Sequence, residues 1–427
     1  MGSNRAESIF MPRRHSTFCP KGIRVAIKHR RAEELRPLRI ACIVDEFTGE
    51  YLKYEADILF LDPNADMFYE LSEFEPDFLF VESAWAGNDD KWRNKMIVQK
   101  KCSEYLQEVL QACEKLAIPR IFWNKEDPPS FDLFSAVAPH FDYVYTTDED
   151  CLIRYKNELG IDAQVLQFAA QPAVHNPFFE FERKNRAVFA GSYYEKFPDR
   201  NLAFSRIVDV LDRVELKLDI FDRCLEFKPA LRKGRIFPER YESLIQGTLD
   251  PGSLAKVNKG YQFQLNLNTV TQSPTMYARR VFESLASGTP VISNYSLAME
   301  NNFGNIPLVI DEGRGCEEEL RHLMSDKKAY EAKSIEGALR VFQGHTFADR
   351  LESVCADIRM DFVSVHHQKI DEEFLREAFS QTIITPAESN DAKIQVMKER
   401  DRAIPKLKRG GMHLLARGYS KAKRILS

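Results

Sequence analysis

The stretch RRVFESLASGTPVISN (279–294) combines a helix, a tight turn and a strand in immediate succession. Its apolar residues, beginning with Phe282, follow helical spacing, and Ser-Gly-Thr-Pro (287–290) ends the helix before a β-branched run. One acid, Glu283, lies four residues after Arg279, which places both side chains on one helical face. The stretch predicts one helix–strand unit of a parallel sheet. It leaves open whether Glu283 forms an ordinary surface ion pair or binds a ligand.

The same alternation of strands and helices runs through most of the 427 residues. It lapses once, where a Pro-rich and then charged segment at 169–185 predicts a linker between two doubly wound sheets. A long helix is expected at 94–116. Ligands of such sheets bind beyond the carboxyl ends of the strands. The expected strands lie at 39–45, 57–62, 77–85, 120–128, 143–150 and 163–170, and then at 187–194, 217–222, 263–270, 290–294 and 306–311.

Charge is distributed unevenly along a chain whose formal net charge is -4. Residues 1–38 hold 9 Lys and Arg against 3 acids, and residues 391–427 hold 11 against 3. An acidic body argues against a dedicated nucleic-acid binder. The basic tail is either solvated or an amphipathic segment that lies on an anionic membrane or docks a partner. Without an apolar run long enough to span a bilayer or a signal core, and with eight cysteines but no Cys-x-x-Cys pair, a cytoplasmic protein is expected.

Several catalytic motifs are missing from the sequence. It has no Walker A motif, no Gly-x-Gly-x-x-Gly, no His-Glu-x-x-His and no Gly-x-Ser-x-Gly, which disfavours ATPases, dinucleotide oxidoreductases, zincins and α/β-hydrolases. Asp148, Glu149 and Asp150 match a short Asp-x-Asp pattern that holds a divalent metal in some nucleotide-sugar enzymes. We favour another interpretation, in which Thr147 or Asp148 caps the following helix and the acids suit its first turn.

Two loops of the first half combine aromatic and acidic residues. IFWNKEDPPSF (121–131) carries Glu126 and Asp127, and VESAWAGND (81–89) carries Glu82 and Trp85. An indole beside a carboxylate suits a sugar, because ring C–H faces stack on the indole while hydroxyls bond to the acid. The alternative is a loop-closing network that binds no ligand.

The second half contains two candidate phosphate-binding segments. In AGSYYEKFPDRN (190–201), Gly191 and Ser192 free backbone N–H groups near a helix start, and Lys196 and Arg200 supply charge. In the second segment, 268–290, Thr275 offers a hydroxyl, and the helix is expected to point its positive end at the ligand with Arg279 and Arg280 one turn in. Such a site favours a diphosphate.

The residues at 279–293 resemble the nucleotide-sugar motif of GT-B glycosyltransferases, and the match is closest to the CgeB-like (spore maturation protein-like) branch. The resemblance extends in the same order from Arg39 to Met360 through VESAWAGND, FWNKEDPPSFDLF, FDYVYTTDEDCLIRYK, FAAQPAVHNP, FAGSYYEKFPDRN and HTFADRLESV. It implies an α/β GT-B fold with two facing Rossmann-like domains and a cleft between them. The implied organisation is a basic N-terminal extension (1–38), an acceptor domain (39–172), a linker (173–185), a nucleotide-sugar domain (186–360), a helical segment (361–390) and a basic tail (391–427).

The resemblance also implies roles for individual residues. Glu283 would bind the ribose hydroxyls of a UDP- or GDP-sugar, and the diphosphate would be neutralised by Lys196, Arg200, Arg279 or Arg280 without a metal ion. Many relatives carry a second Glu eight residues before the ribose-binding one, and Thr275 stands at that position here. An inverting transfer would need a general base, for which the candidates are Glu82, Glu126, Asp127 and His175.

The expected function is therefore transfer of a hexose-type sugar to a hydroxyl of a glycan, lipid-linked or protein acceptor. The setting would be bacterial surface polysaccharide or glycoconjugate synthesis, in the cytoplasm or at the inner face of the membrane through the basic tail. Two alternatives remain at this point. One is a nucleotide-sugar epimerase of the same fold, and the other is a degenerate member that binds sugars or assembles a complex.

Overall fold

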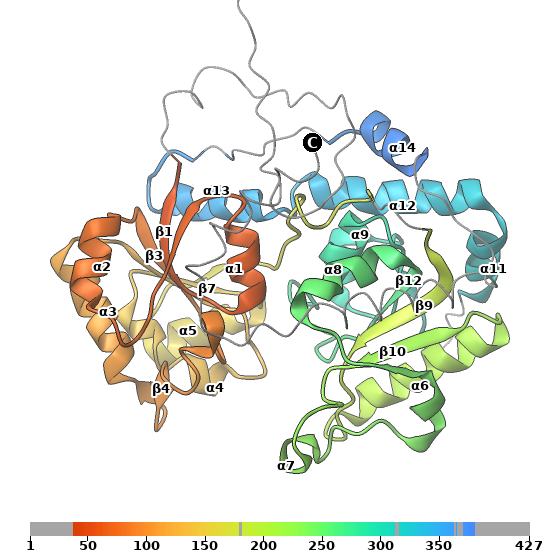
Figure 1. Ribbon diagram of the computed structural model, residues 1–427, viewed down its shortest axis with the longest axis horizontal. Coiled ribbons are helices and arrows are strands. Elements are labelled where there is room, and N and C mark those ends of the chain that lie inside the picture. Colours follow the sequence, from red (N-terminus) through yellow and green to blue (C-terminus); the bar gives the residue numbers. More distant parts are fainter. Residues whose placement is uncertain (1–36, 179–181, 312–315, 363, 365–369, 381–427) are drawn as a thin grey trace, which may run out of the picture. The chain divides into compact units, whose positions relative to one another are not determined.

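Two six-stranded parallel sheets form the body of the protein (Figure 1). The computed structural model describes residues 37–178, 182–311, 316–362, 364 and 370–380. Almost all of the predicted N-terminal extension and the whole basic tail lie outside these residues. Within them, no helix has the length and apolar character that crossing a bilayer requires.

The strand order of the first sheet is β2-β1-β3-β6-β7-β8, and every neighbouring pair is parallel. The order reverses between β1 and β3, so the loops that follow these two strands leave in opposite directions and open a crevice between them. This is the switch point of the first sheet. Its strands are β1 Arg39–Ile43, β2 Asp57–Phe60, β3 Phe78–Glu82, β6 Arg120–Asn124, β7 Tyr143–Thr146 and β8 Gln164–Val165.

Both faces of the first sheet are buried, as expected for parallel strands. In β1, Ala41 and Ile43 join one apolar core and Ile40 and Cys42 join another, because successive side chains point to opposite faces. The first face is covered by α2 and α3. The helices and short turns of this half are α1 Glu46–Leu52, α2 Met67–Phe74, η1 Asn88–Asp90, α3 Glu104–Lys115, α4 Phe131–Phe134, η2 Ala138–His140, η3 Glu149–Cys151 and α5 Leu152–Leu159.

The second sheet is also parallel throughout, but its strand order, β11-β10-β9-β12-β13-β14, differs from that of the first. Its switch point lies between β9 and β12, with three strands on each side. Its strands are β9 Lys184–Gly191, β10 Leu218–Asp222, β11 Ile245–Gly247, β12 Tyr261–Asn266, β13 Val291–Ser293 and β14 Leu308–Val309. The associated helices are α6 Pro198–Arg213, α7 Pro229–Arg232, η4 Glu239–Leu244, α8 Pro251–Gly260, α9 Arg280–Ala286, α10 Leu297–Phe303, α11 Glu317–Ser325 and α12 Lys327–Phe342.

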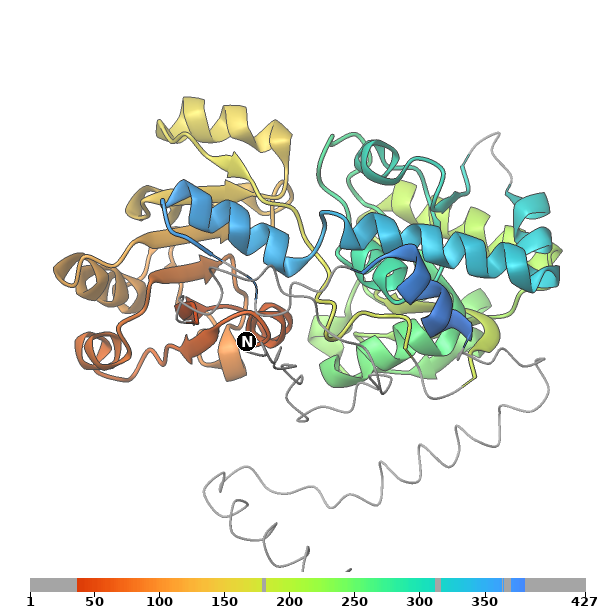
Figure 2. The same ribbon diagram turned by 90° about the horizontal axis from the view of Figure 1, so that it is seen from above.

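The last helices complete both cores. Helix α14, Glu372–Ser380, lies beside α12, and Leu375 packs against Ile335 (Figures 1 and 2). Helix α13, Phe347–Asp357, instead packs on the second face of the first sheet, where Leu351 and Val354 join the core formed around Ile40. The chain therefore returns to its first sheet after building its second one.

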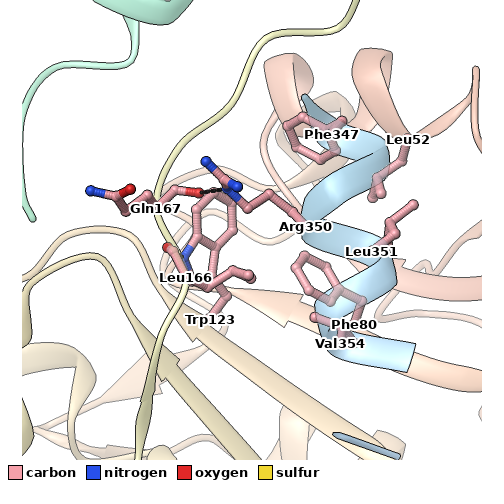
Figure 3. A pocket seen from close by; sticks show the side chains of 9 residues that line it. All are labelled: Leu52, Phe80, Trp123, Leu166, Gln167, Phe347, Arg350, Leu351 and Val354. Atoms are coloured by element: carbon pink, nitrogen blue, oxygen red, sulfur yellow. Dashed lines mark hydrogen bonds between the residues drawn. The ribbon is translucent and has the colours of Figure 1, made fainter. Parts of the chain in front are cut away.

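Arg350 holds α13 to the segment that follows β8. Its guanidinium donates to the carbonyl oxygens of Gln167 at 3.0 Å, Phe168 at 3.1 Å and Gly344 at 3.0 Å. Figure 3 shows Arg350 reaching Gln167 at the edge of a small apolar pocket between α13 and the sheet, which Trp123 also lines. The segment HTFADRLESV, part of the resemblance, thus fastens a helix to the first sheet.

The predicted helix at 94–116 is wrong in its first half. A short hairpin, β4 Ile97–Val98 with β5 Lys101–Cys102, occupies that part, and the helix α3 begins only at Glu104. The Ser103 side chain accepts from the Leu106 N–H at 3.1 Å and caps it there. Apolar residues of the hairpin happen to continue the helical period, which concealed the break.

We expect Arg350→Ala to lower the free energy of unfolding by about 2–3 kcal/mol, because three backbone carbonyls lose a charged donor at a partly buried site. Urea titration followed by circular dichroism measures the change. The control is Arg376→Ala, which removes an exposed ion pair with Glu372 and should change stability by less than about 0.5 kcal/mol. Equal effects of the two substitutions would contradict a fastening role for Arg350.

Candidate donor and acceptor sites

A buried charge network closes the carboxyl edge of the first sheet at its switch point. Glu82, at the end of β3, accepts from the Asp45 N–H at 2.6 Å and from the Thr48 hydroxyl at 2.6 Å. Lys125, which follows β6, lies 3.1 Å from Glu82 and 2.7 Å from Asp45. Although burial opposes its charged form, these two carboxylates raise the pKa of Lys125 above its ordinary value. Burial raises the pKa of Glu82, against the opposing effect of Lys125.

The structure separates the two acids of the loop after β6. Asp127 is fully buried, and its carboxylate accepts from Asn124 at 2.7 Å, Thr146 at 2.6 Å and Tyr155 at 3.0 Å. Burial raises the pKa of Asp127 to about 7 in spite of these donors. Glu126 is half-buried, and within the described part of the chain its carboxylate has no hydrogen-bond or ion-pair partner. Only Glu126 of this pair is placed to meet a ligand.

The acidic run at 148–150 caps a helix, as we favoured. Asp148 accepts from the Asp150 N–H at 3.2 Å at the start of η3, and it also accepts from the Ser273 hydroxyl at 2.5 Å. Asp148 is 1 % exposed. Both hydrogen bonds of the Asp148 carboxylate are therefore made with groups of the protein. The bond from Ser273 joins the loop after β7 to the segment that precedes α9.

Glu283 is deeply buried rather than part of a surface ion pair. Only 1 % of it is exposed, and its Oε1 atom lies 2.7 Å from Arg279 Nε and accepts from the Tyr51 hydroxyl at 2.6 Å. Tyr51 belongs to α1, and the Arg279 guanidinium also lies 3.9 Å from the ring of Phe47 on that helix. The other carboxylate oxygen, Oε2, is buried and has no partner among the described groups. Burial alone would raise the pKa of Glu283, but the charge of Arg279 and the hydrogen bond from Tyr51 hold it below its ordinary value.

His175 belongs to this same cluster and is engaged at both ring nitrogens. The Gln171 N–H donates to Nδ1 at 3.1 Å, which leaves the proton of the neutral ring on Nε2, 3.4 Å from the Tyr51 oxygen. Burial lowers the pKa of His175 to about 4, so the ring is neutral near pH 7. The hydrogen bonds then run in one direction, from Gln171 through His175 and Tyr51 to Glu283.

Thr275 lies on contacts with the first half of the chain. Its hydroxyl donates to the Thr147 carbonyl at 3.0 Å and accepts from the Glu149 N–H at 2.8 Å, and its carbonyl accepts from Gln167 at 2.6 Å. Helix α9 begins only at Arg280, so the prediction that Arg279 and Arg280 lie one turn inside a helix is wrong. Pro274 and Thr275 precede the helix in a bend, from which Thr275 contacts the first half of the chain.

Three arginines gather at the switch point of the second sheet, and we call Arg200, Arg223 and Arg280 the arginine cluster. Arg280 donates to the Ala190 carbonyl at the end of β9, and Arg200 donates to the Ser192 carbonyl at 3.1 Å. Arg223, which follows β10, donates to the Tyr194 hydroxyl at 2.7 Å.

The cluster carries positive charge that the described residues do not neutralise. Burial, followed by the like charge of Arg200, lowers the pKa of Arg280 to about 10. Burial and the nearby Arg223 act in the same direction on Arg200, whose pKa is also about 10. Within the described ranges, none of the three forms an ion pair with a carboxylate. Arginines that lower one another's pKa at a sheet's carboxyl edge create a site for a multiply charged anion.

The turn after β9 accounts for the remaining predicted residues. A Cβ on Gly191 would lie 2.7 Å from the ring of Phe189, so the position demands glycine for close packing. Ser192 is buried, with its hydroxyl 3.3 Å from the Cys224 sulfur. Lys196 is exposed, and its ammonium lies 4.7 Å from the ring of Phe197. Of these three, Lys196 alone has a side chain free to move toward an anion.

The structure adds functional candidates that our sequence analysis missed. Asp45 lies two residues after β1 and Arg223 directly follows β10, both at carboxyl ends of parallel strands, so the rule on carboxyl ends would have identified both. No signal identified Tyr51, because its partner Glu283 is 232 residues away in the sequence. An aromatic residue on an amphipathic helix is most simply read as core.

Part of the chain is similar to a known protein family. A family model described as glycosyl transferase-like matches residues 220–356, a range that contains Arg223, Arg280 and Glu283. Together with two Rossmann-like sheets, this match confirms the predicted GT-B fold class. The narrower CgeB-like assignment remains a prediction. No curated protein sequence matches the chain.

Solved structures with a similar fold include three glycosyl-transfer proteins at low identity. Sucrose-phosphate synthase from Thermosynechococcus elongatus is 11 % identical with a TM-score of 0.45, covering 75 % of this chain and 98 % of its own. An alpha1,3-fucosyltransferase is 13 % identical with a TM-score of 0.42, covering 81 % and 96 %. The T4 phage protein BGT, in complex with UDP and Mn2+, is 10 % identical with a TM-score of 0.43, covering 75 % and 99 %.

The low pKa of His175 predicts a loss of stability in acid. The unfolded chain binds a proton near pH 6.5 and the folded protein only near pH 4, so stability is full above pH 6.5 and falls as the pH is lowered toward 4. The contribution is about 3 kcal/mol. Urea unfolding is measured at several pH values between 6.5 and 4. Over this range the free energy of unfolding of His175→Gln should fall by about 3 kcal/mol less than that of the wild type.

The matched control for this experiment is His140→Gln, which removes an exposed imidazole from η2. It should reproduce the wild-type dependence on pH. If His175→Gln also follows the wild-type curve, the ring is charged in the folded state, and the one-directional chain of hydrogen bonds to Glu283 does not exist.

Proposed function

We propose that this protein is a glycosyltransferase that moves a sugar from a nucleoside diphosphate sugar to a hydroxyl group of an acceptor. The observation that carries the proposal is the arginine cluster at the switch point of the second sheet. A diphosphate carries several negative charges and needs matching donors, which guanidinium groups supply in fixed directions. The glycosyl transferase-like match spans two of the three arginines. In this proposal Lys196 adds a mobile charge at the rim.

In the proposed donor complex, Glu283 accepts from a ribose hydroxyl through Oε2. That atom is buried and unpartnered, and leaving it so costs free energy that a hydroxyl donor would restore. Tyr51 and Arg279 already occupy Oε1. Because Glu283 is only 1 % exposed, a nucleotide reaches it only when Tyr51 or the whole of α1 moves away from α9.

The transfer itself forms one bond and breaks one. The acceptor oxygen bonds to the anomeric carbon as the bond from that carbon to the diphosphate oxygen breaks, and the electron pair leaves with the diphosphate. The arginine cluster stabilises the charge that develops there. The acceptor hydroxyl must also lose a proton. We assign this step to Glu126, since both carboxylate oxygens of Glu82 and of Asp127 are occupied by protein donors.

In this mechanism His175 acts as a positioning residue. Its ring is neutral and engaged at both nitrogens, so it orients Tyr51 rather than accepting the acceptor's proton. Thr275, at the position where many relatives carry a second Glu, would likewise act by joining the two halves of the chain. Its hydroxyl is occupied by the Thr147 carbonyl and the Glu149 N–H.

The finer features of the proposal follow from the same cations and from the family resemblance. The donor would be a UDP- or GDP-hexose, and the arginine cluster would supply the positive charge that a metal ion supplies elsewhere. The CgeB-like resemblance supports a role in bacterial surface polysaccharide or glycoconjugate synthesis. The site of action would be the cytoplasm or the inner face of the membrane, with contact through the basic tail.

We expect Arg280→Ala to weaken binding of UDP or GDP at least about tenfold in isothermal titration, because a buried charged donor to the diphosphate is lost. Glu283→Gln should weaken it about threefold to tenfold through the ribose. The control is Arg240→Ala, an exposed residue paired with Asp209 on α6, which should leave affinity unchanged.

Three outcomes would contradict the proposed function. One is that neither UDP nor GDP binds, and the second is that Arg280→Ala leaves the affinity unchanged. The third concerns the nucleotide-sugar epimerase alternative. The protein is incubated with UDP-sugars and no acceptor, and the products are identified by mass spectrometry and sugar analysis. Interconversion of the intact nucleotide sugar would indicate an epimerase and contradict the proposed transfer.

A further inference from the structure

An exposed tryptophan marks the switch point of the first sheet. Trp85 lies in the loop after β3, at the carboxyl edge beside the point where the strand order reverses, and it is 50 % exposed. Open α/β sheets bind their ligands in this crevice. An indole of this size left in water loses the free energy that its burial would provide. The position and the exposure together point to a ligand that covers the ring.

The loop holds Trp85 in a fixed place. Asp45 Oδ1 accepts from the N–H groups of Ala86 at 3.2 Å and Gly87 at 2.9 Å, and the Trp92 N–H donates to the Ala86 carbonyl at 2.9 Å. Gly87 has a φ of 66°, and a Cβ there would lie 2.6 Å from Trp92. Only glycine fits, so the backbone next to Trp85 has little freedom.

The indole ring is also braced from one side. Its centroid lies 5.2 Å from that of Phe134 on α4, and the two ring planes are 86° apart. Edge-to-face packing of this kind fixes the orientation of both rings. An oriented ring loses less conformational entropy when a ligand stacks on it, which favours specific recognition over loose contact.

The surroundings of Trp85 are charged rather than apolar. Asp45 and Lys125 form the ion pair of the same edge, with side chains that are 20 % and 14 % exposed, and Glu126 follows in the next loop. Among residues 44–47, 83–92 and 125–131, Trp85 is the one large apolar side chain that is exposed. These ranges therefore lack the contiguous apolar patch that marks many protein and membrane contact sites. A sugar ring instead offers an apolar C–H face for the indole and hydroxyl groups for the charged side chains.

We propose that Trp85 is the stacking platform for a sugar ring of the acceptor, so that the acceptor is itself a glycan or glycoside. This inference rests on the proposed function, because it assigns the acceptor of the same transfer. The acceptor's ring stacks on the indole, and its hydroxyls bond to Asp45 and Lys125. A neighbouring hydroxyl is presented to Glu126 for transfer.

Tryptophan fluorescence tests the proposal directly, because the chain has three tryptophans. Trp92 and Trp123 are 0 % and 3 % exposed, so quenching by acrylamide reports mainly on Trp85. The full-length protein is titrated with soluble oligosaccharides of glucose, galactose, mannose, N-acetylglucosamine and rhamnose. We expect at least one of them to shift the emission and reduce the quenching. Trp85→Ala should abolish this response and weaken binding, measured by calorimetry, about tenfold or more.

Two further variants separate stacking from a general effect on the fold. Trp85→Phe keeps an aromatic face and should bind the same oligosaccharide within a few-fold of the wild type. Tyr105→Ala, at an exposed aromatic on α3, should leave binding unchanged. Affinity for UDP should be the same in all of these proteins, because the arginine cluster is untouched.

The proposal is overturned if no oligosaccharide in the panel alters the fluorescence, or if Trp85→Ala binds the active oligosaccharide as tightly as the wild type. It is also overturned if UDP alone protects Trp85 from acrylamide, since the ring would then stack on a nucleobase. A protein that binds UDP normally and fails these tests loses this inference only. A protein that fails to bind UDP or GDP loses the proposed function.

Discussion

The carboxylate of Glu283 is a buried contact point between the two halves of this protein. One of its oxygens is held by Arg279 on its own helix and by Tyr51 from α1, a residue that belongs to the other sheet. A buried carboxylate is tolerated only when charges and donors of this kind surround it. Glu283 therefore keeps one of these two partners, the Tyr51 hydroxyl, only while α1 stays in place. The remaining oxygen has no partner, so the arrangement is stable but incomplete.

An incomplete network at a domain contact connects binding with movement. In the proposed donor complex, a ribose hydroxyl that reaches Oε2 would displace or bypass the covering residues of α1, while the arginine cluster would bind the diphosphate of the same ligand. His175 orients Tyr51, which in turn donates to Glu283. The ring does this as a neutral group, because burial lowers its pKa. The linker that carries His175, helix α1 and helix α9 are thus joined by one set of hydrogen bonds.

Much of the fold followed from periodicity. Alternating strands and helices predicted two parallel sheets, and the structure has them. Periodicity failed before Ser103, where a hairpin has apolar residues at helical spacing and was therefore predicted as the first half of a helix. It also failed where roles depend on residues distant in the chain. Neither the engagement of Asp127 by Tyr155 nor that of Glu283 by Tyr51 leaves a trace in local spacing.

Helix α13 sets a constraint on how the chain can fold. It packs on the second face of the first sheet. The last strand of that sheet, β8, ends at Val165, and α13 begins only at Phe347, some 180 residues later. During synthesis the first sheet can form with one face covered by its own helices, while the other face is covered only in part, by Tyr51 and Leu52 of α1. Such a face is prone to aggregation and is a natural substrate for chaperones. The first sheet to be synthesised is therefore completed only when one of the last helices of the chain, α13, has been made.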